Sequence, residues 1–306
     1  MSKVYKVCII TGASSGLGFE TSKKMASLGY EVILACQNKS KAKLAMSKIK
    51  RDFPHARLIY MNLDLNSFRS IDQFSSNFHL TGKKLNVLIN NAAWMDNSRA
   101  TTPSLTEDRF EKTFGVNHLG HFLLTTLLLD VLQSTAKFDI EARVVVISSA
   151  VSNPGHKSRA QLDFNDIQLL KPEAYNGSLA YKNSKMANVL FAHELHRRLD
   201  GTSVTCNVIN PGFMPSTNVF RNQTCFGKCF MQCFLPCVCP CMARSVSQGA
   251  NCVAFVASDS HLKDISGRCF VGCEETDSNY LESKDIDVAK RLWELSERMV
   301  ATINLT

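Results

Sequence analysis

Six short apolar runs alternate with stretches of helical periodicity along this chain of 306 residues. The runs are unbroken, which is typical of strands covered on both faces. Strand–helix alternation of this kind predicts a parallel sheet with right-handed crossovers. The sequence therefore predicts an α/β fold, a single doubly wound parallel sheet with helices on both faces, in one domain spanning 1–306. The predicted strands are 5–10, 31–36, 57–63, 86–90, 143–148 and 203–209, and the predicted helices are 17–28, 41–51, 68–78, 106–133, 178–199 and a core-packed 285–300.

The composition is that of an ordinary globular protein, with 45% hydrophobic and 20% charged residues. The formal net charge of +8 is mild, so it permits an anionic ligand or an acidic membrane surface and does not indicate nucleic acid. The sequence shows neither a signal peptide nor an apolar run of membrane-spanning length. We therefore expect a cytoplasmic protein, with peripheral contact to an intracellular membrane left open. The 12 cysteines are expected to be reduced rather than to form a disulfide framework.

A glycine-rich turn joins the first predicted strand to the first helix. It is of the GxxxGxG type, and its glycines allow a tight turn and a close approach of the backbone to a phosphate. The helix that follows offers free N–H groups to an anion. A purely structural turn is the alternative. The turn predicts a Rossmann-type dinucleotide site, and its binding residues are expected to be Gly12, Ser14, Ser15, Gly16, Leu17 and Gly18.

The second predicted strand ends without the acidic residue that usually binds the adenosine ribose of NAD. Lys39 and Lys41 follow it instead, and their charges suit a 2′-phosphate. The sequence thus favours NADP(H) over NAD(H). Asp64, which follows the third strand, is expected either to accept from the adenine amino group or to cap the next helix.

Tyr181 and Lys185 are four residues apart in a predicted helix, so they share one face. A phenol with a pKa near 10 is a poor base at neutral pH. A neighbouring ammonium and an oxidised nicotinamide ring favour the phenolate, which predicts a lowered pKa and a usable general acid or base. Tyr280 and Lys284 repeat the spacing but follow no suitable strand, so we interpret them as surface residues.

Other polar residues are placed to join this pair. Ser148 and Ser149 end a buried strand, where a hydroxyl can bond to a reacting oxygen. Asn117 lies within an otherwise apolar helical pattern, where its low helix propensity suggests a polar role. His118 and His121 beside it are interpreted as packing residues rather than catalytic ones.

Together these motifs resemble the short-chain dehydrogenase/reductase family over about residues 5–300. The resemblance rests on the TGASSGLG turn, Asn117, Ser149, the Tyr181–Lys185 pair, and two further segments, 90–93 and 211–212. It implies that Tyr181 is the catalytic acid/base, that Lys185 holds the nicotinamide ribose, that Ser149 donates to the substrate oxygen, and that Asn117 anchors a proton-relay water. It also implies that the remaining cofactor contacts are Asn90, Ala92, Pro211, Gly212 and Ser216 or Thr217.

Within this family the chain is similar to the branch of retinol dehydrogenases, WW-domain oxidoreductases and protochlorophyllide reductases. The similarity lies in NHLGHF at 117–122, HELHRRL at 193–199 and RLWELSERMV at 291–300. Phe213 stands where the light-dependent reductases have cysteine, which argues against photoreduction. Gln37 stands where this branch has an arginine for the 2′-phosphate, so selectivity for NADPH is reduced or falls to Lys39 and Lys41.

A cysteine-rich segment at about 219–243 lies where the family covers its substrate. Three interpretations stay open: an apolar lid that uses cysteine as a small hydrophobic residue, a membrane contact through acylated cysteines, and a metal site. The metal site is disfavoured because the spacing lacks paired CxxC units, and the family's chemistry needs no metal. The cysteines are Cys225, Cys229, Cys233, Cys237, Cys239 and Cys241.

The sequence therefore predicts an oxidoreductase that transfers hydride between NADP(H) and an alcohol or carbonyl group of a hydrophobic substrate, such as a retinoid, steroid or lipid aldehyde. The partner is thus a small molecule, and the family resemblance suggests a homodimer. Two alternatives remain, a catalytically silent dinucleotide-binding sensor or scaffold and a C=C reductase of the same fold.

Overall fold

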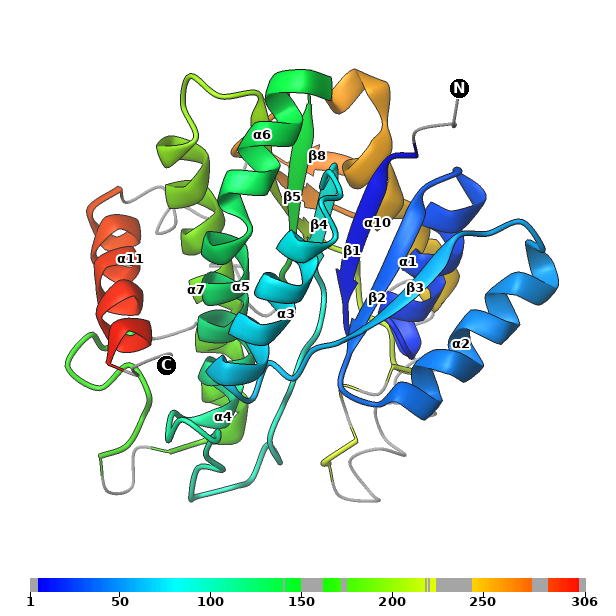
Figure 1. Ribbon diagram of the computed structural model, residues 1–306. Coiled ribbons are helices and arrows are strands. Elements are labelled where there is room, and N and C mark those ends of the chain that lie inside the picture. The colour runs from blue at the N-terminus through cyan, green and yellow to red at the C-terminus, as the bar shows by residue number, and fades with distance from the viewer. Residues whose placement is uncertain are drawn as a thin grey trace.

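The computed structural model describes residues 5–139, 141–149, 162–171, 175–217, 219, 221–223, 244–276 and 286–302. Its centre is one eight-stranded sheet in the order β3-β2-β1-β4-β5-β6-β7-β8, in which only the β7–β8 pair is antiparallel (Figure 1). The predicted doubly wound parallel sheet is confirmed. The strands are β1 Val7–Thr11, β2 Glu31–Cys36, β3 Leu58–Asn62, β4 Val87–Asn90, β5 Ala142–Ile147, β6 Val204–Asn210, β7 Cys269–Val271 and β8 Glu274–Thr276.

Helices cover both faces of this sheet, and each face has its own apolar core. One core joins the sheet to α1 and α10, and the other joins it to α3, α5, α7 and α11. The central strands are buried along their whole length, as the unbroken apolar runs predicted. The helices are α1 Gly16–Ser27, α2 Lys39–Asp52, α3 Phe68–Leu80, α4 Lys112–Phe114, α5 Gly120–Leu127, α6 Leu129–Asp139, α7 Gly177–Arg198, α10 Val246–Ser258 and α11 Ile286–Ala301, with a π-helical turn η1 at Gly115–Leu119 and a 3-10 turn η6 at Ser260–Leu262.

The long helix predicted over 106–133 is wrong in its detail. The helical segment begins at Lys112, passes through η1, and breaks again between α5 and α6. A π-helical turn inserts one residue into the usual repeat, and such turns are frequent at functional sites. Apolar periodicity alone does not reveal this insertion, because the residues on both sides of it are buried.

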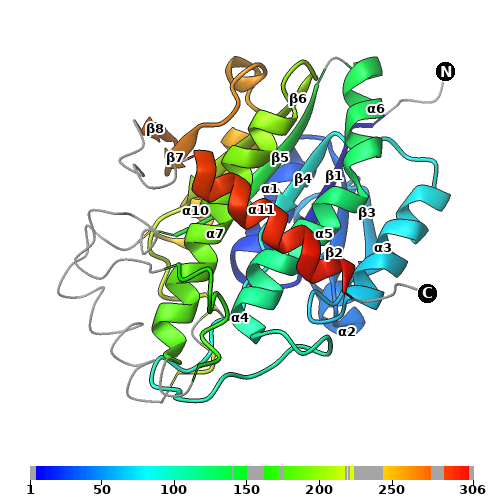
Figure 2. The same ribbon diagram turned by 90° about the vertical axis from the view of Figure 1, so that its left-hand side faces the viewer.

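The last helix packs against the core as predicted. Figure 2 shows α11 crossing α7 on the outside of the molecule. Its Trp293 stacks on Phe191 of α7, with ring centroids 5.8 Å apart, and meets Phe122 of α5 edge-on. This aromatic cluster fixes α7, the helix that bears Tyr181.

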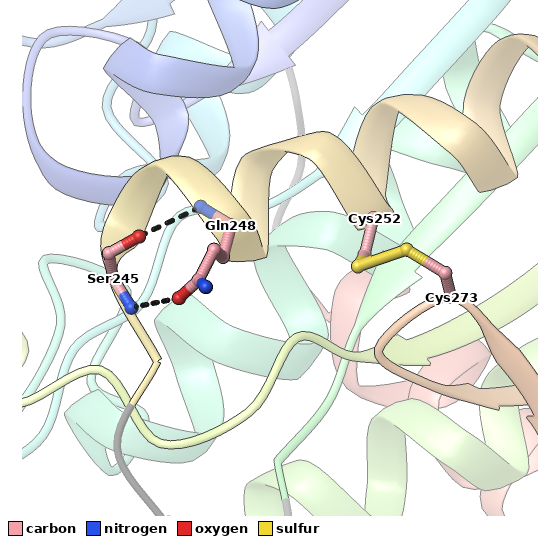
Figure 3. The surroundings of a disulfide bond; sticks show 4 residues. All are labelled: Ser245, Gln248, Cys252 and Cys273. Atoms are coloured by element: carbon pink, nitrogen blue, oxygen red, sulfur yellow. Dashed lines mark hydrogen bonds between the residues drawn. A yellow bond between two sulfur atoms is a disulfide. The ribbon is translucent and has the colours of Figure 1, made fainter. Parts of the chain in front are cut away.

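One pair of cysteines corrects the expectation of reduced thiols. Cys252 of α10 forms a disulfide with Cys273 in the turn between β7 and β8 (Figure 3). The Cα atoms are 4.8 Å apart, within the range that a disulfide spans. Ser245 and Gln248 form a capping box at the start of α10, and Cys252 lies further along the same helix. The four free cysteines among the described residues are all buried: Cys8, Cys36, Cys206 and Cys269.

In the part of the chain that the structure describes, no single helix has both the length and the apolarity to cross a membrane. The bent pair 112–127 and 129–138, with an angle of 51° between its halves, meets that test only when taken together. The cysteines at 225–241, on which the lid, membrane and metal interpretations rest, lie outside the described residues, as do Tyr280 and Lys284.

Candidate active site

The glycine-rich turn places backbone N–H groups where a phosphate can reach them. Gly12 has a φ of +66°, which side-chain-bearing residues rarely adopt. A Cβ on Gly18 would lie 2.5 Å from the carbonyl oxygen of Gly12, so only glycine fits there. Ser15 caps α1 without a side-chain hydrogen bond, which leaves the first amides of the helix free. The cradle therefore fits the pyrophosphate of a dinucleotide.

The end of β2 presents an amide rather than a guanidinium. Gln37 donates from Nε2 to Asp64 Oδ2 at 2.7 Å, and Asp64 Oδ1 accepts the backbone N–H of Asn66. Asp64 thus stabilises the turn after β3 while one edge of it faces the cavity. Lys41 lines the same cavity, whereas Lys39, the first residue of α2, does not.

Tyr181 and Lys185 lie on successive turns of α7, which begins at a capping Asn176 whose side chain accepts from the N–H groups of Ser178 and Leu179. Lys185 Nζ is 5.7 Å from the centroid of the Tyr181 ring and donates to the carbonyl oxygen of Ile147 at 3.2 Å. The two residues therefore lie side by side on one helix face, and Lys185 reaches the carboxyl end of β5.

Burial dominates the ionisation of this pair. It raises the pKa of Tyr181 to about 12, and a hydrogen bond with Ser149 partly opposes the shift. Burial also lowers the pKa of Lys185 to about 8. In the protein alone, burial therefore raises the phenol pKa in spite of the neighbouring Lys185. The lowering expected from the ammonium together with an oxidised nicotinamide ring stays a prediction for the complex with the cofactor. A raised pKa keeps Tyr181 protonated at neutral pH, in the form that donates a proton.

The two serines after β5 have separate partners. Ser148 donates from Oγ to the carbonyl oxygen of Lys185 at 3.0 Å, so it joins the strand end to α7. Ser149 makes the hydrogen bond to Tyr181. The second serine of the pair is therefore the one beside the phenol, where the family resemblance placed it.

Asn117 does not line the cavity. It is fully buried in η1, where Oδ1 accepts from Trp94 N at 2.7 Å and Nδ2 donates to Trp94 O at 2.8 Å. Nδ2 also donates to Ser184 Oγ at 3.0 Å. Its carboxamide therefore fixes the backbone of Trp94 and joins it to α7.

The two histidines are buried packing residues, as interpreted from the sequence. His118 Nε2 lies 2.8 Å from Ser296 Oγ of α11, and His121 Nε2 lies 2.9 Å from Thr11 Oγ1 at the end of β1. Burial lowers the pKa of His118 to about 3 and that of His121 to about 4, so both are neutral at pH 7.

One cavity of about 590 Å³ brings most of the predicted site residues together. It runs from the adenosine side at Gln37 and Lys41, past the glycine turn, to Ser149 and Tyr181. Three predicted cofactor contacts do not line it: Lys39, Asn90, whose buried side chain donates to Thr125, and the exposed Ser216. The predicted residues that do line it are Gly12, Ser14, Ser15, Gly16, Leu17, Gly18, Gln37, Lys41, Asp64, Ala92, Ser149, Tyr181, Lys185, Pro211, Gly212 and Thr217.

The structure adds lining residues that sequence reasoning missed. Asn91, rather than Asn90, faces the glycine turn, and its Nδ2 donates to Thr11 O at 2.7 Å. Trp94, Lys112 and Arg221 also line the cavity, with both cations against the Trp94 ring. They come from three separate segments, and no local pattern in the sequence joins them.

A glycine-rich phosphate cradle beside a buried lysine and a half-buried tyrosine and serine, on a doubly wound sheet, defines a dinucleotide-dependent oxidoreductase. The short chain dehydrogenase family model matches residues 6–161. The chain belongs to the short-chain dehydrogenase/reductase family.

Curated relatives match almost the whole chain. WW domain-containing oxidoreductase from Danio rerio is 40% identical over 300 residues, covering 96% of this chain and 68% of the relative. Human retinol dehydrogenase 14 is 36% identical over 312 residues, covering 97% of this chain and 87% of the relative. The chain is therefore a member of the branch that the sequence motifs indicated.

Solved structures share the fold. An uncharacterized protein from Mycobacterium paratuberculosis aligns with a TM-score of 0.72 at 29% identity, over 97% of this chain and 94% of its own. An actinorhodin polyketide ketoreductase variant solved with NADPH aligns with a TM-score of 0.67 at 19% identity, over 88% of this chain and 96% of its own.

Proposed function

We propose that this protein transfers hydride between NADP(H) and an alcohol or carbonyl group of a hydrophobic substrate, with Tyr181 as the proton donor or acceptor. The observation that carries the proposal is the hydrogen bond between Tyr181 and Ser149, inside the cavity that the glycine turn opens into. Similarity to retinol dehydrogenases supports a hydrophobic alcohol or carbonyl as substrate. Apolar side chains also contribute to the wall of the cavity, at Val116, Phe213, Met214 and Val219.

The residues present fit a bound dinucleotide, which supplies the hydride acceptor or donor. The turn around Gly12 and Gly18 would hold the pyrophosphate, and Lys41 and Gln37, which line the same cavity, would lie on the side of the adenosine ribose. A 2′-phosphate suits the charge of Lys41, and β2 is followed by no carboxylate that would repel it. NADP(H) is therefore the favoured cofactor.

In the direction of reduction, the hydroxyls of Ser149 and Tyr181 hold the carbonyl oxygen, and Tyr181 gives its proton to that oxygen. Lys185 lies beside the phenol and stabilises the phenolate that results. In the direction of oxidation, the phenolate of Tyr181 accepts the proton of the alcohol. Ser148 and Ile147 keep the geometry by bonding to Lys185 rather than to substrate.

The test is the oxidation of NADPH with a panel of hydrophobic aldehydes and ketones, followed by product analysis. We expect alcohols as products and a loss of at least about 100-fold in kcat for Tyr181→Phe, with the Kd for NADPH little changed. Tyr60→Phe is a matched control, because the Tyr60 hydroxyl bonds to Asn62 outside the cavity. If no carbonyl compound is turned over, the result would favour a catalytically silent dinucleotide-binding scaffold. If the products contain a saturated C=C bond and an intact carbonyl group, the protein is a C=C reductase.

A further inference from the structure

Trp94 forms part of the wall of the cavity that also contains Tyr181. Its backbone is held on both sides by the carboxamide of Asn117. Its indole Nε1 is buried, and no acceptor for its N–H lies among the described residues. The ring is therefore rigidly placed while its one polar group is unused.

Two cations lie over this ring. Lys112 Nζ is 4.4 Å from the ring centroid, and the guanidinium carbon of Arg221 is 4.7 Å from it. Neighbours of Arg221 hold its segment in place: Asn222 Nδ2 donates to Met95 O at 2.8 Å and Gln223 Nε2 donates to Asp96 O at 2.9 Å. An aromatic face attracts both charges, and it gathers them at one end of the cavity.

Glu111, next to Lys112 in the sequence, and Asp96, two residues after Trp94, have other partners. Glu111 accepts the backbone N–H groups of Thr113 and Phe114 and the hydroxyl of Tyr175. Asp96 accepts from the N–H groups of Asn97 and Ser104. Within the described residues, no carboxylate lies within ion-pair distance of Lys112 Nζ.

Acidic and basic side chains are unevenly distributed along the cavity. Its single acidic lining residue among those described is Asp64, at the adenosine end, where Gln37 already bonds to it. The end with the two cations belongs to a cavity whose wall also has the apolar side chains of Val116 and Phe213. This end suits a molecule that is apolar along its length and negatively charged at its tip.

We propose that the substrate is an apolar carbonyl compound with an anionic group remote from the reacting carbon, and that Lys112 and Arg221 bind that group beside Trp94. This inference rests on the proposed function, because it places the substrate carbonyl at Tyr181. The anion is a carboxylate or a phosphate monoester, since both offer the oxygens that guanidinium and ammonium groups bind.

The experiment compares three aldehydes of equal chain length: ω-oxododecanoate, its methyl ester and ω-oxododecyl phosphate. We expect kcat/KM for at least one anionic aldehyde to exceed that for the ester about tenfold or more. The anionic aldehyde with the higher kcat/KM then shows whether the site prefers a carboxylate or a phosphate monoester. Lys112→Met and Arg221→Met should each reduce that acid-to-ester ratio about five- to tenfold, and Lys112→Arg should retain it. Lys263→Met removes an exposed cation distant from the cavity lining and should leave the ratio unchanged.

Two results would overturn the inference while leaving the proposed function intact. One is a kcat/KM for the methyl ester that equals the values for both anionic aldehydes. The other is an acid-to-ester ratio of kcat/KM that neither Lys112→Met nor Arg221→Met lowers. A supporting result should also weaken with added salt, because part of the attraction between half-exposed charges is screened.

Failure of the proposed function is recognised separately. If none of the three aldehydes is reduced with either nucleotide, the site is tested by binding alone. Trp94 is one of only two tryptophans in the chain, and the other, Trp293, is buried against α7. Dodecanoate should then quench tryptophan fluorescence where dodecanol does not, and the double variant Lys112→Met/Arg221→Met should abolish the difference. Equal quenching by acid and alcohol would reject the anion site.

Discussion

The ammonium of Lys185 donates a 3.2 Å hydrogen bond to the carbonyl oxygen of Ile147, the last residue of β5. Since Ser149 follows two residues later, this bond fixes α7 against the strand end that supplies the partner of Tyr181. This position removes the ammonium from water, and burial lowers the pKa of Lys185 to about 8. The catalytic geometry therefore has a measurable cost in stability.

Replacing Lys185 by methionine should remove a pH dependence of stability. The lowered pKa means that the folded protein loses this proton at about pH 8 and the unfolded chain at about pH 10.5. Between these values the unfolded chain binds more protons, so wild-type stability rises with pH in this window. The free energy of unfolding of Lys185→Met minus that of wild type should thus shrink by about 2 kcal/mol from pH 7.5 to pH 10. Urea denaturation at both pH values measures it, and a constant difference would contradict a buried ammonium.

The raised pKa of Tyr181 predicts opposite pH profiles for the two reaction directions. Reduction needs the protonated phenol, which persists through neutral pH, whereas oxidation needs the phenolate, whose fraction rises with pH. We expect kcat/KM for alcohol oxidation to increase from pH 6 to pH 9 while that for carbonyl reduction does not. Ser149→Ala removes the hydrogen bond that lowers this pKa, and should move the oxidation profile to higher pH. A profile that Ser149→Ala moves downward would show that the serine does not stabilise the phenolate.

Sequence reasoning predicted the sheet and the Tyr181 neighbourhood because both rest on local patterns. Buried parallel strands appear as unbroken apolar runs, and a spacing of four places Lys185 beside Tyr181. The π-helical turn at Asn117 and the cluster of Trp94, Lys112 and Arg221 depend on contacts between distant segments. The solvation of the phenol also depends on the complete fold, so the sequence alone did not reveal that burial raises the pKa of Tyr181 in the protein without cofactor.

Gln37 predicts a weak preference for NADPH that one substitution should strengthen. The amide bonds to Asp64 rather than offering a charge to the ribose. Gln37→Arg should raise the ratio of kcat/KM for NADPH over NADH about tenfold, since a guanidinium binds phosphate through paired, charge-assisted hydrogen bonds. Lys41→Ala should lower the same ratio, and Lys50→Ala at the far end of α2 should not change it. A wild-type preference for NADH would contradict the cofactor assignment.

The buried His118 predicts sensitivity to acid. Its pKa is lowered to about 3, so between pH 6.5 and that value the unfolded chain binds a proton that the folded protein does not. Stability is therefore lost as the pH falls, by about 2 kcal/mol from pH 7 to pH 5 for this residue. His118→Phe keeps the ring among Phe114, Phe122 and Phe191 and leaves Ser296 bonded to Leu292 O. Its unfolding free energy should accordingly depend less on pH over that range, and an unchanged dependence would mean that His118 is protonated in the folded state.

The disulfide between Cys252 and Cys273 predicts a stability that depends on the redox state. It closes a loop with a sequence separation of 21, which in the chain-entropy model stabilises the folded protein by about 3 kcal/mol. Dithiothreitol should therefore lower the Tm of the wild type and have no effect on Cys273→Ser. Cys206→Ser provides the matched control, because Cys206 is a buried free thiol and its variant should keep the response to dithiothreitol. A wild type whose Tm is indifferent to the reductant, with both thiols reactive to alkylation after unfolding, would show that α10 and the β7–β8 turn are not cross-linked.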